Sequence, residues 1–361
     1  MGLNEKFFKS ASDTPIVPTD HFNTVTWAGD NTAKTIPVGF QPDLIWLKNR
    51  NNSTYSSHRH LWYDSVRGVS AGYIHSDGTS AQESYPAVSG FASTGFNLPQ
   101  STQGSTEAGM NDGAGNGTYV AWCWKAGATT TTIAANTVGN TIASDVRANV
   151  DAGFSIVKHT GTGAVGTVGH GLDSAPELII YKQTSSSSPN KNWIVYASPL
   201  GNTGGLLLNV TNSKFTDTDA WNNTTPTSTV FSLGAGDDAY ESQTNVSGKE
   251  NIAYCFHSVD GYSKIGSYTG TGNASNITVS LGFSPRFLMV KKTNATSSWL
   301  IMDAVRNPSS PFNTFLLADG SGAEFIANAL TFSYDSTSFT VSNTDGTFNA
   351  NGGTYIYLAI A

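Results

Sequence analysis

One strand recurs three times along the chain, and this constrains the fold more than any other feature. Its copies read GFQPDLIWLK, GLDSAPELIIYK and GFSPRFLMVK, at residues 39–48, 171–182 and 282–291. Each copy places a proline six residues before a lysine, at Pro42/Lys48, Pro176/Lys182 and Pro285/Lys291. A strand that returns with the same internal spacing predicts tandem copies of one structural unit.

Two further landmarks follow each copy in the same order. The first is a strand centred on Tyr63, Tyr196 or Met302, in LWYDSVRG, WIVYASPLG and WLIMDAVRN. The second is a closing strand that contains Cys123, Cys255 or Ala359. Three ordered landmarks at similar offsets divide the chain into module 1 (residues 22–128), module 2 (153–261) and module 3 (262–361).

The segments outside the modules have a different composition. Residues 129–152 are rich in Thr and Asn, which predicts a linker with room for one short strand. Residues 1–21 contain Pro15 and Pro18 and are expected to form an extended N-terminal arm. Modules 2 and 3 meet without a linker, so we expect them to pack rigidly together.

Apolar residues within each module follow a period of two, in runs rich in β-branched and aromatic residues that end at Gly, Asn, Asp or Ser. The best helical candidate, AEFIANAL at 323–330, is short. The sequence therefore predicts an all-β fold of three antiparallel β-sandwiches of the jelly-roll or lectin-like kind. The aromatic pairs Trp122/Trp124 and Tyr254/Phe256 fit a sandwich core or, alternatively, platforms that stack on sugars.

Composition argues against several classes of protein. Of the 361 residues only 12% are charged, the net charge is −7, and 19 Lys and Arg are scattered along the chain, which argues against nucleic-acid binding. No apolar run approaches the roughly 20 residues of a membrane span, and the N-terminus lacks the apolar run of a signal peptide. Cys123 and Cys255 are expected to be buried free thiols.

Motifs for catalysis or metal binding are weak. GVSAG around Ser70 matches a nucleophile-elbow pattern without its parallel sheet or helix, and GTGAVG at 161–166 precedes no helix, so it predicts a turn. No cofactor is expected, although the acidic turns at 111–117 and 236–241 leave calcium open. Asp64/Arg67 and Asp303/Arg306 share one spacing, which suits either closure of a turn or contact with a ligand.

The ordered set GFQPDLIWLKNR, LWYDSVRG, NGTYVAWCWKAG, DAGFSIVKHTGTGAVGTVGHGL and IAYCFHSVDGYSKIGSYTGTG resembles repeat-containing virion proteins of tailed bacteriophages, especially those of marine and cyanobacterial hosts. The resemblance covers nearly the whole chain from Phe22 onward. Module 3 departs from it, because YIYLAIA lacks the Cys-aromatic pair and resembles a terminal capping module.

The resemblance implies a non-enzymatic structural protein, a tail fibre or appendage adhesin that binds a glycan or protein of the host surface. It also implies assembly in the host cytoplasm, residence in the virion, a homotrimer, and attachment to other virion proteins through residues 1–21. A head or tail decoration protein is one alternative. A polysaccharide-degrading enzyme is another, but no spacing of acidic residues indicates the required carboxylate pair.

If the modules contact sugars, exposed side chains near the module tips are the expected binding residues. The candidates are His60, Trp62, Arg67, Tyr85, Trp221 and Arg306.

Overall fold

The computed structural model describes residues 16–51, 59–101, 109–113, 116–186, 190–236, 244–273, 276–328, 330, 332–342 and 345–361. As predicted, the fold is all-β, and every pair of named strands is antiparallel. Within the described residues no helix has the length and hydrophobicity needed to cross a membrane. The helical segments are short: η1 (Pro18–Asp20), η2 (Val69–Ala71), η3 (Ser198–Leu200) and α1 (Gly346–Asn349).

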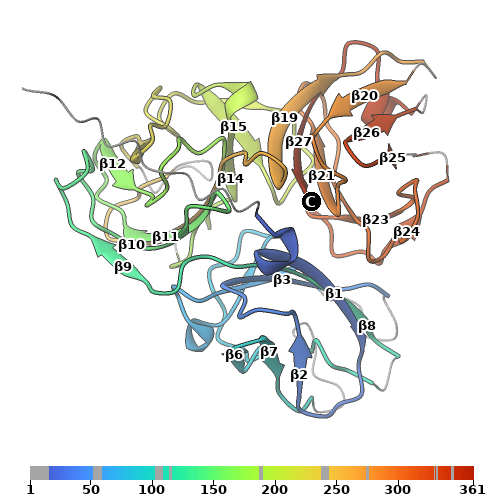
Figure 1. The fold of residues 1–361 in the computed structure, drawn as a ribbon. Coiled ribbons are helices and arrows are strands. Elements are labelled where there is room, and N and C mark those ends of the chain that lie inside the picture. Colours follow the sequence, from blue (N-terminus) through green and yellow to red (C-terminus); the bar gives the residue numbers. More distant parts are fainter. Residues whose placement is uncertain are drawn as a thin grey trace, which may run out of the picture.

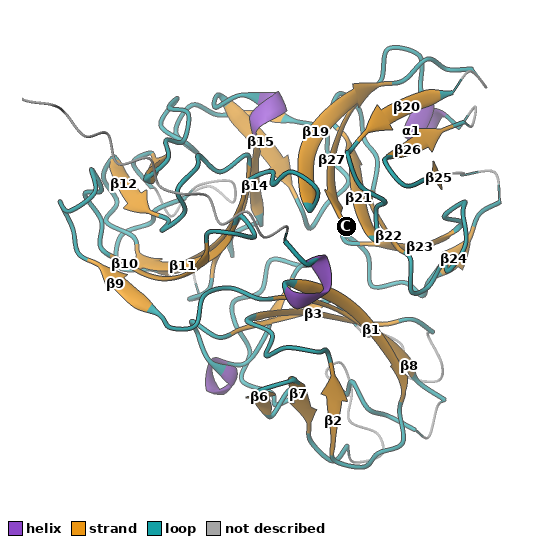
Figure 2. Cartoon of the chain, viewed as in Figure 1, coloured by secondary structure: helices purple, strands orange, loops and turns teal. Residues whose placement is uncertain are grey.

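Module 1 pairs a main sheet with a small one (Figures 1 and 2). The main sheet runs β1 (Phe22–Ala28), β8 (Thr118–Trp124), β3 (Leu44–Asn49), β4 (Leu61–Asp64) and β5 (Ile74–His75). The small sheet runs β2 (Lys34–Pro37), β7 (Gly95–Leu98) and β6 (Gly90–Ala92).

Module 2 repeats this order and extends it. Its main sheet runs β9 (Thr131–Ile133), β10 (Ser144–Asn149), β11 (Phe154–Thr160), β18 (Glu250–Phe256), β13 (Leu178–Gln183), β14 (Ile194–Ala197), β15 (Gly204–Leu207) and β16 (Phe215–Thr216). The strands β11, β18, β13, β14 and β15 correspond to β1, β8, β3, β4 and β5 of module 1. The small sheet pairs β12 (Gly166–Gly169) with β17 (Val230–Leu233).

Module 3 has the same order again. Its main sheet runs β19 (Ser263–Thr269), β27 (Thr354–Ile360), β21 (Phe287–Lys292), β22 (Trp299–Asp303), β23 (Thr314–Leu317) and β24 (Phe325–Ile326). The small sheet runs β20 (Ile277–Ser280), β26 (Ser338–Val341) and β25 (Phe332–Tyr334).

The segment between modules 1 and 2 differs from the sequence prediction. Residues 129–152 are not a linker with one strand, because β10 pairs with β11 and β9 pairs with β10, which adds an edge to the module 2 sheet. Val146 on β10 is buried in the sandwich core of that module. The short helical candidate at 323–330 contains the two-residue strand β24, and its described residues form no helix.

The N-terminal arm is described only from residue 16, so most of the predicted arm lies outside the described residues. Ile16 packs against the central hydrophobic core, and the ring of His21 lies edge-on to Tyr262 of module 3. The main-chain N–H of Lys125 donates to the carbonyl of His21 at 2.8 Å. Residues 16–21 thus pack on the modules.

The three main sheets share a central core. Figure 1 shows them arranged around a common centre, with module 1 in blue to teal, module 2 in green to yellow and module 3 in orange to red. One cluster of buried apolar side chains joins all three, whereas each module keeps a separate sandwich core between its own two sheets. Because successive residues point to opposite faces, the main strands are buried on both faces and read as unbroken apolar runs.

The closing-strand aromatics belong to this central core. Trp122, Trp124, Tyr254 and Phe256 are buried there, and the alternate residues, such as Cys123, face the sandwich cores. They are therefore neither in the sandwich core nor available as sugar platforms. Both cysteines are buried and free, as predicted, and burial raises the pKa of each thiol.

The three repeated lysines connect the modules in a ring. The Nζ of Lys48 donates to the carbonyl of Ser321 in module 3 at 2.9 Å. Lys182 likewise reaches Thr79 of module 1 at 2.8 Å, and Lys291 reaches Thr211 of module 2 at 2.9 Å. All three lysines have no exposed surface. In each module the repeated lysine therefore forms a hydrogen bond to a main-chain carbonyl of a different neighbouring module.

These buried lysines predict stability that rises with pH. Burial lowers the pKa of Lys48 to about 8, of Lys182 to about 7 and of Lys291 to about 8, from an ordinary 10.5. Between those values and 10.5 the unfolded chain holds more protons than the folded chain, so the free energy of unfolding increases with pH. Below about pH 7 both states are protonated and the cost of burying the charges is fully present.

Urea unfolding at pH 7 and pH 9 measures this slope. Each lysine contributes at most about 1.4 kcal/mol per pH unit. Lys182→Met removes the lysine with the lowest pKa and is expected to flatten the slope between these two pH values. An unchanged slope in this variant, or a wild-type stability that falls between pH 7 and 9, would contradict the assignment.

A cleft between modules 2 and 3 as the candidate functional site

The predicted binding residues are mostly interior. His60, Trp62 and Trp221 are at most 1% exposed, the side chain of Arg67 is 3% exposed, and that of Arg306 is 0% exposed. The prediction that these five lie exposed at module tips is therefore wrong. Tyr85 is the one exposed member of the set, at 42%.

Two of the buried candidates have clear structural partners. His60 accepts from the indole N–H of Trp46 through Nδ1 at 2.7 Å, which leaves Nε2 to donate to the carbonyl of Leu317 in module 3 at 2.9 Å. Burial holds the pKa of His60 well below 6.5, so the ring is neutral. Trp62 packs in the central core against Trp193 of module 2.

Trp221 lies apart from the other candidates, in the sandwich core of module 2. Its ring is edge-on to the rings of Tyr181 and Tyr196.

The Asp/Arg pairs close turns and also join modules. Asp64 accepts from the Nε of Arg67 at 2.5 Å and from the main-chain N–H of Arg67 at 2.8 Å. Asp64 also accepts from the hydroxyl of Tyr254 in module 2, at 2.9 Å. Of the two roles left open by the sequence, the contacts support structural closure.

The module 3 pair repeats this arrangement toward module 1. Asp303 accepts from the Nε of Arg306 at 2.6 Å and from the indole N–H of Trp122 at 3.0 Å. Each Asp/Arg pair thus binds a closing strand of the adjacent module.

The junction of module 3 with module 2 lacks this pair. Strand registers place Ala197 at the position of the Asp, and Leu358 at the position of Trp122 and Tyr254. Leu200 takes the position of the Arg, because it follows Ala197 by the same three residues. The donor and its acceptor are therefore both replaced by apolar groups. Ala197 and Leu358 are buried in the central core.

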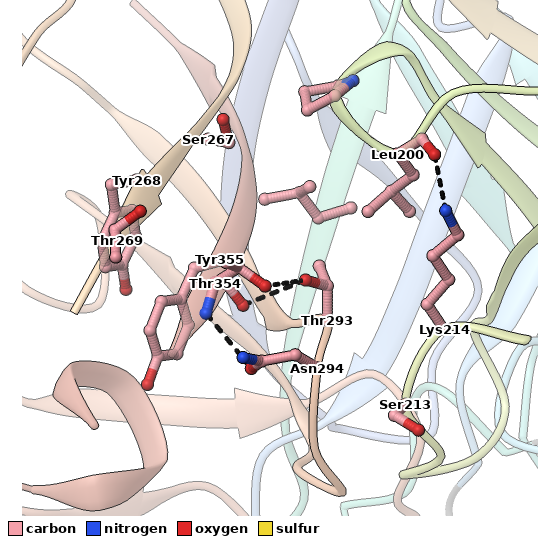
Figure 3. A pocket seen from close by; sticks show the side chains of 12 residues that line it. Leu200, Ser213, Lys214, Ser267, Tyr268, Thr269, Thr293, Asn294, Thr354 and Tyr355 are labelled. Carbon is pink, nitrogen blue, oxygen red and sulfur yellow. Dashed lines mark hydrogen bonds between the residues drawn. The ribbon is translucent and has the colours of Figure 1, made fainter. Parts of the chain in front are cut away.

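A cleft of about 440 Å³ opens beside Leu200 at this junction (Figure 3). Its volume lies within the range of ordinary ligand pockets. Twelve described residues line it, and none is Asp or Glu. They are Pro199, Leu200, Ser213 and Lys214 of module 2, with Ser267, Tyr268, Thr269, Thr293, Asn294, Thr354, Tyr355 and Ile356 of module 3.

Equivalent positions at the junction of modules 3 and 1 carry an ionic network. A main-chain hydrogen bond crosses both junctions, from Lys214 to Thr293 at 2.7 Å and from Glu324 to Arg50 at 2.8 Å. Glu324 thus corresponds to Lys214, and Arg50 corresponds to Thr293. The Glu324 carboxylate is bound by Arg50 at 2.7 Å and approached by Arg306 at 3.5 Å.

The junction of modules 1 and 2 also carries charged side chains at the corresponding positions. Gln82 donates its main-chain N–H to the carbonyl of Thr184 at 2.9 Å, which matches the Lys214 contact. Strand registers place Lys158 and Glu250 where the cleft has Ser267 and Thr354, and their side chains pair at 3.8 Å. The cleft is thus the junction at which neutral groups replace ionic contacts.

Hydrogen bonds within module 3 order one wall of the cleft, as the dashed lines in Figure 3 show. The hydroxyls of Thr293 and Thr354 are 2.5 Å apart, and Asn294 accepts from the main-chain N–H of Thr354 at 3.1 Å. Tyr355 is fully buried behind this wall, stacked on Tyr268 with centroids 4.7 Å apart. The wall therefore presents hydroxyl and amide groups rather than an aromatic face.

The opposite wall carries the only basic residue among the described lining residues. The Nζ of Lys214 donates to the carbonyl of Leu200 at 2.7 Å, which fixes its position. An ammonium group has three N–H donors, so two remain. The hydroxyls of Ser213, Ser267 and Thr269 make no hydrogen bond to the described part of the chain, so they are available to a ligand.

The structure does not support the candidate calcium turns or the candidate nucleophile Ser70. The described residues contain no group of three or more His, Cys, Asp or Glu side chains placed to hold a metal. Part of each acidic turn considered for calcium lies outside the described residues. Ser70 lies in the short helix η2 rather than on a strand-to-helix elbow.

Comparison with known proteins gives a family without a known function. A family model described as a domain of unknown function, DUF7483, matches residues 17–361. The match spans all three modules and the segment between modules 1 and 2. No curated protein sequence matches the chain.

Proposed function

This chain belongs to the DUF7483 family, and we propose that it is a non-enzymatic virion adhesin that binds a host-surface glycan in the cleft between modules 2 and 3. The observation that carries the proposal is the replacement of ionic contacts by hydroxyl and amide groups at this one junction. Such groups form directional hydrogen bonds with sugar hydroxyls. The phage resemblance of the sequence supplies the virion setting.

The packing of the modules bears on how the adhesin would gain avidity. The repeated strands face a common core, so the chain does not present three separate and equivalent sandwich surfaces. Multivalent attachment would therefore depend on several chains, as in the trimer that the resemblance implies. Residues 1–21 are the proposed link to the virion.

The lining of the cleft favours binding over glycan cleavage. Glycoside hydrolysis ordinarily needs two carboxylates about 5–10 Å apart, and the described lining has none. A decoration protein of the head or tail remains the outcome to expect if the purified chain binds no host surface.

The test is binding of the fluorescently labelled full chain to candidate host cells and to their isolated surface polysaccharide. Ser267→Trp places a bulky side chain at the exposed cleft wall and is expected to weaken binding at least about tenfold, because the ring occupies the ligand space. Thr26→Trp is the matched control, since Thr26 has the same register position on β1 and is also exposed.

Each result decides between the functions. Saturable binding that Ser267→Trp reduces and Thr26→Trp preserves supports the adhesin. Equal binding by both variants places the contact elsewhere, and release of reducing ends from the polysaccharide supports an enzyme. Absence of binding to every surface favours a decoration protein.

A further inference from the structure

We propose that the cleft selects a saccharide bearing a carboxylate, such as a hexuronate, and that Lys214 binds this carboxylate. The inference rests on the proposed function and specifies its ligand class. It is carried by the charge of the cleft and by the three-way comparison of junctions within the chain.

The first argument is the uncompensated charge of Lys214. Within the described residues no Asp or Glu forms an ion pair with Lys214, and none lines the cleft. The side chain is half-buried and held by Leu200, so its ammonium group is fixed rather than free to extend into solvent. A fixed cation at a partly enclosed site favours an anionic ligand.

The second argument comes from the corresponding junction of modules 3 and 1. There the chain itself places a carboxylate, that of Glu324, between Arg50 and Arg306. At the cleft the position of Glu324 is taken by a lysine, and the arginine positions are taken by Thr293 and Leu200. At the junction of modules 3 and 1 the protein thus supplies both the carboxylate and the basic side chains. At the cleft it supplies only the basic side chain of Lys214, so a ligand can supply the carboxylate.

The third argument is the distribution of neutral donors. Ser267 and Thr269 lie across the cleft from the Lys214 side (Figure 3), and both are exposed. A uronate can place its carboxylate at Lys214 and its ring hydroxyls toward these residues. A simple carboxylate without hydroxyls would leave that wall unused.

The experiment is isothermal titration of the full chain with two probes. The first probe is a hexuronate disaccharide, and the second is the same disaccharide with its carboxylates reduced to hydroxymethyl groups. Wild-type protein is expected to bind the acidic probe at least about tenfold more tightly, and less tightly as salt is added. Lys214→Gln is expected to abolish this preference and leave affinity for the neutral probe unchanged.

Two further variants make the result specific. Lys158→Gln removes a lysine outside the cleft and is expected to bind both probes as the wild type does. Gln is the residue that module 1 carries at the position equivalent to Lys214, so Lys214→Gln should keep the fold, which its urea unfolding transition checks.

The outcomes separate this inference from the proposed function. If Ser267→Trp blocks cell binding but Lys214→Gln leaves the affinity for the acidic probe unchanged, the inference is overturned and the adhesin stands. The same holds if neither probe binds while cell binding still depends on Ser267. If the wild type binds neither probe and no host surface, both fail.

Discussion

Module 3 on its own, residues 262–361, is expected not to fold. Its main sheet turns one face to the central core, and separation from modules 1 and 2 would expose that face to water. The apolar side chains on it include Phe287, Met289, Trp299, Ile301 and Leu358. Full exposure of each costs about 1.5–3 kcal/mol, and a domain of this size has a total stability of about 5–15 kcal/mol.

Circular dichroism and size-exclusion chromatography of isolated module 3 measure whether it folds. We expect an unfolded or aggregated chain without a cooperative melting transition, whereas the full chain unfolds cooperatively. A monomeric module 3 that melts cooperatively would show that the central core is dispensable. The family match across residues 17–361 agrees with one folding unit.

Asp64→Ala is expected to lower the free energy of unfolding by about 3–5 kcal/mol, because it leaves the buried guanidinium of Arg67 without its carboxylate. The hydroxyl of Tyr254 loses its acceptor at the same time. Urea unfolding of the full chain measures the loss. Glu250→Ala, which breaks the exposed pair with Lys158, is the control and should cost less than about 1 kcal/mol.

Another junction of the chain indicates which further substitutions should restore the stability lost in Asp64→Ala. At the junction of modules 3 and 2 the same three positions are occupied by Ala197, Leu200 and Leu358, all apolar. The triple variant Asp64→Ala/Arg67→Leu/Tyr254→Leu copies that solution and should recover most of the lost stability, because no buried charge is left unpaired. A triple variant as unstable as Asp64→Ala would contradict this account of the pair.

Much of the fold was predictable from the repeats. The three landmarks correctly identified the strands that become β3, β4 and β8 and their counterparts, since apolar runs of this length bounded by turn residues form strands. The central core was not predicted. The unbroken run at 44–47 indicates a strand buried on both faces, but a sequence does not show whether the second face meets its own module or another one.

The candidate site was harder to predict for a related reason. Aromatic and charged residues such as Trp62 and Arg67 attract attention as binding groups, yet here they lie inside the junctions. The informative feature of the sequence is that module 2 has Ala197 and Leu200 at the positions of the Asp and the Arg. Only the packing of the three modules shows that a cleft opens beside Leu200.

The packing of three modules around one core accounts for the three copies of one strand in the sequence. Three copies pack in a ring, with Lys48, Lys182 and Lys291 each bound to a carbonyl of another module. Two junctions keep Asp/Arg pairs that strengthen the ring. The third carries neutral groups in their place, and this difference makes a ligand site possible without loss of the shared core.

Hydrogen–deuterium exchange of the full chain, with and without the isolated polysaccharide of the candidate host surface, tests the central claim most directly. The account predicts slower exchange in peptides that contain residues 199–214, 267–269 and 293–294, and no change at the equivalent segments of the other two junctions. Slower exchange confined to another surface, such as that around Tyr85, or no change in any peptide, would contradict the assignment of the cleft as the binding site.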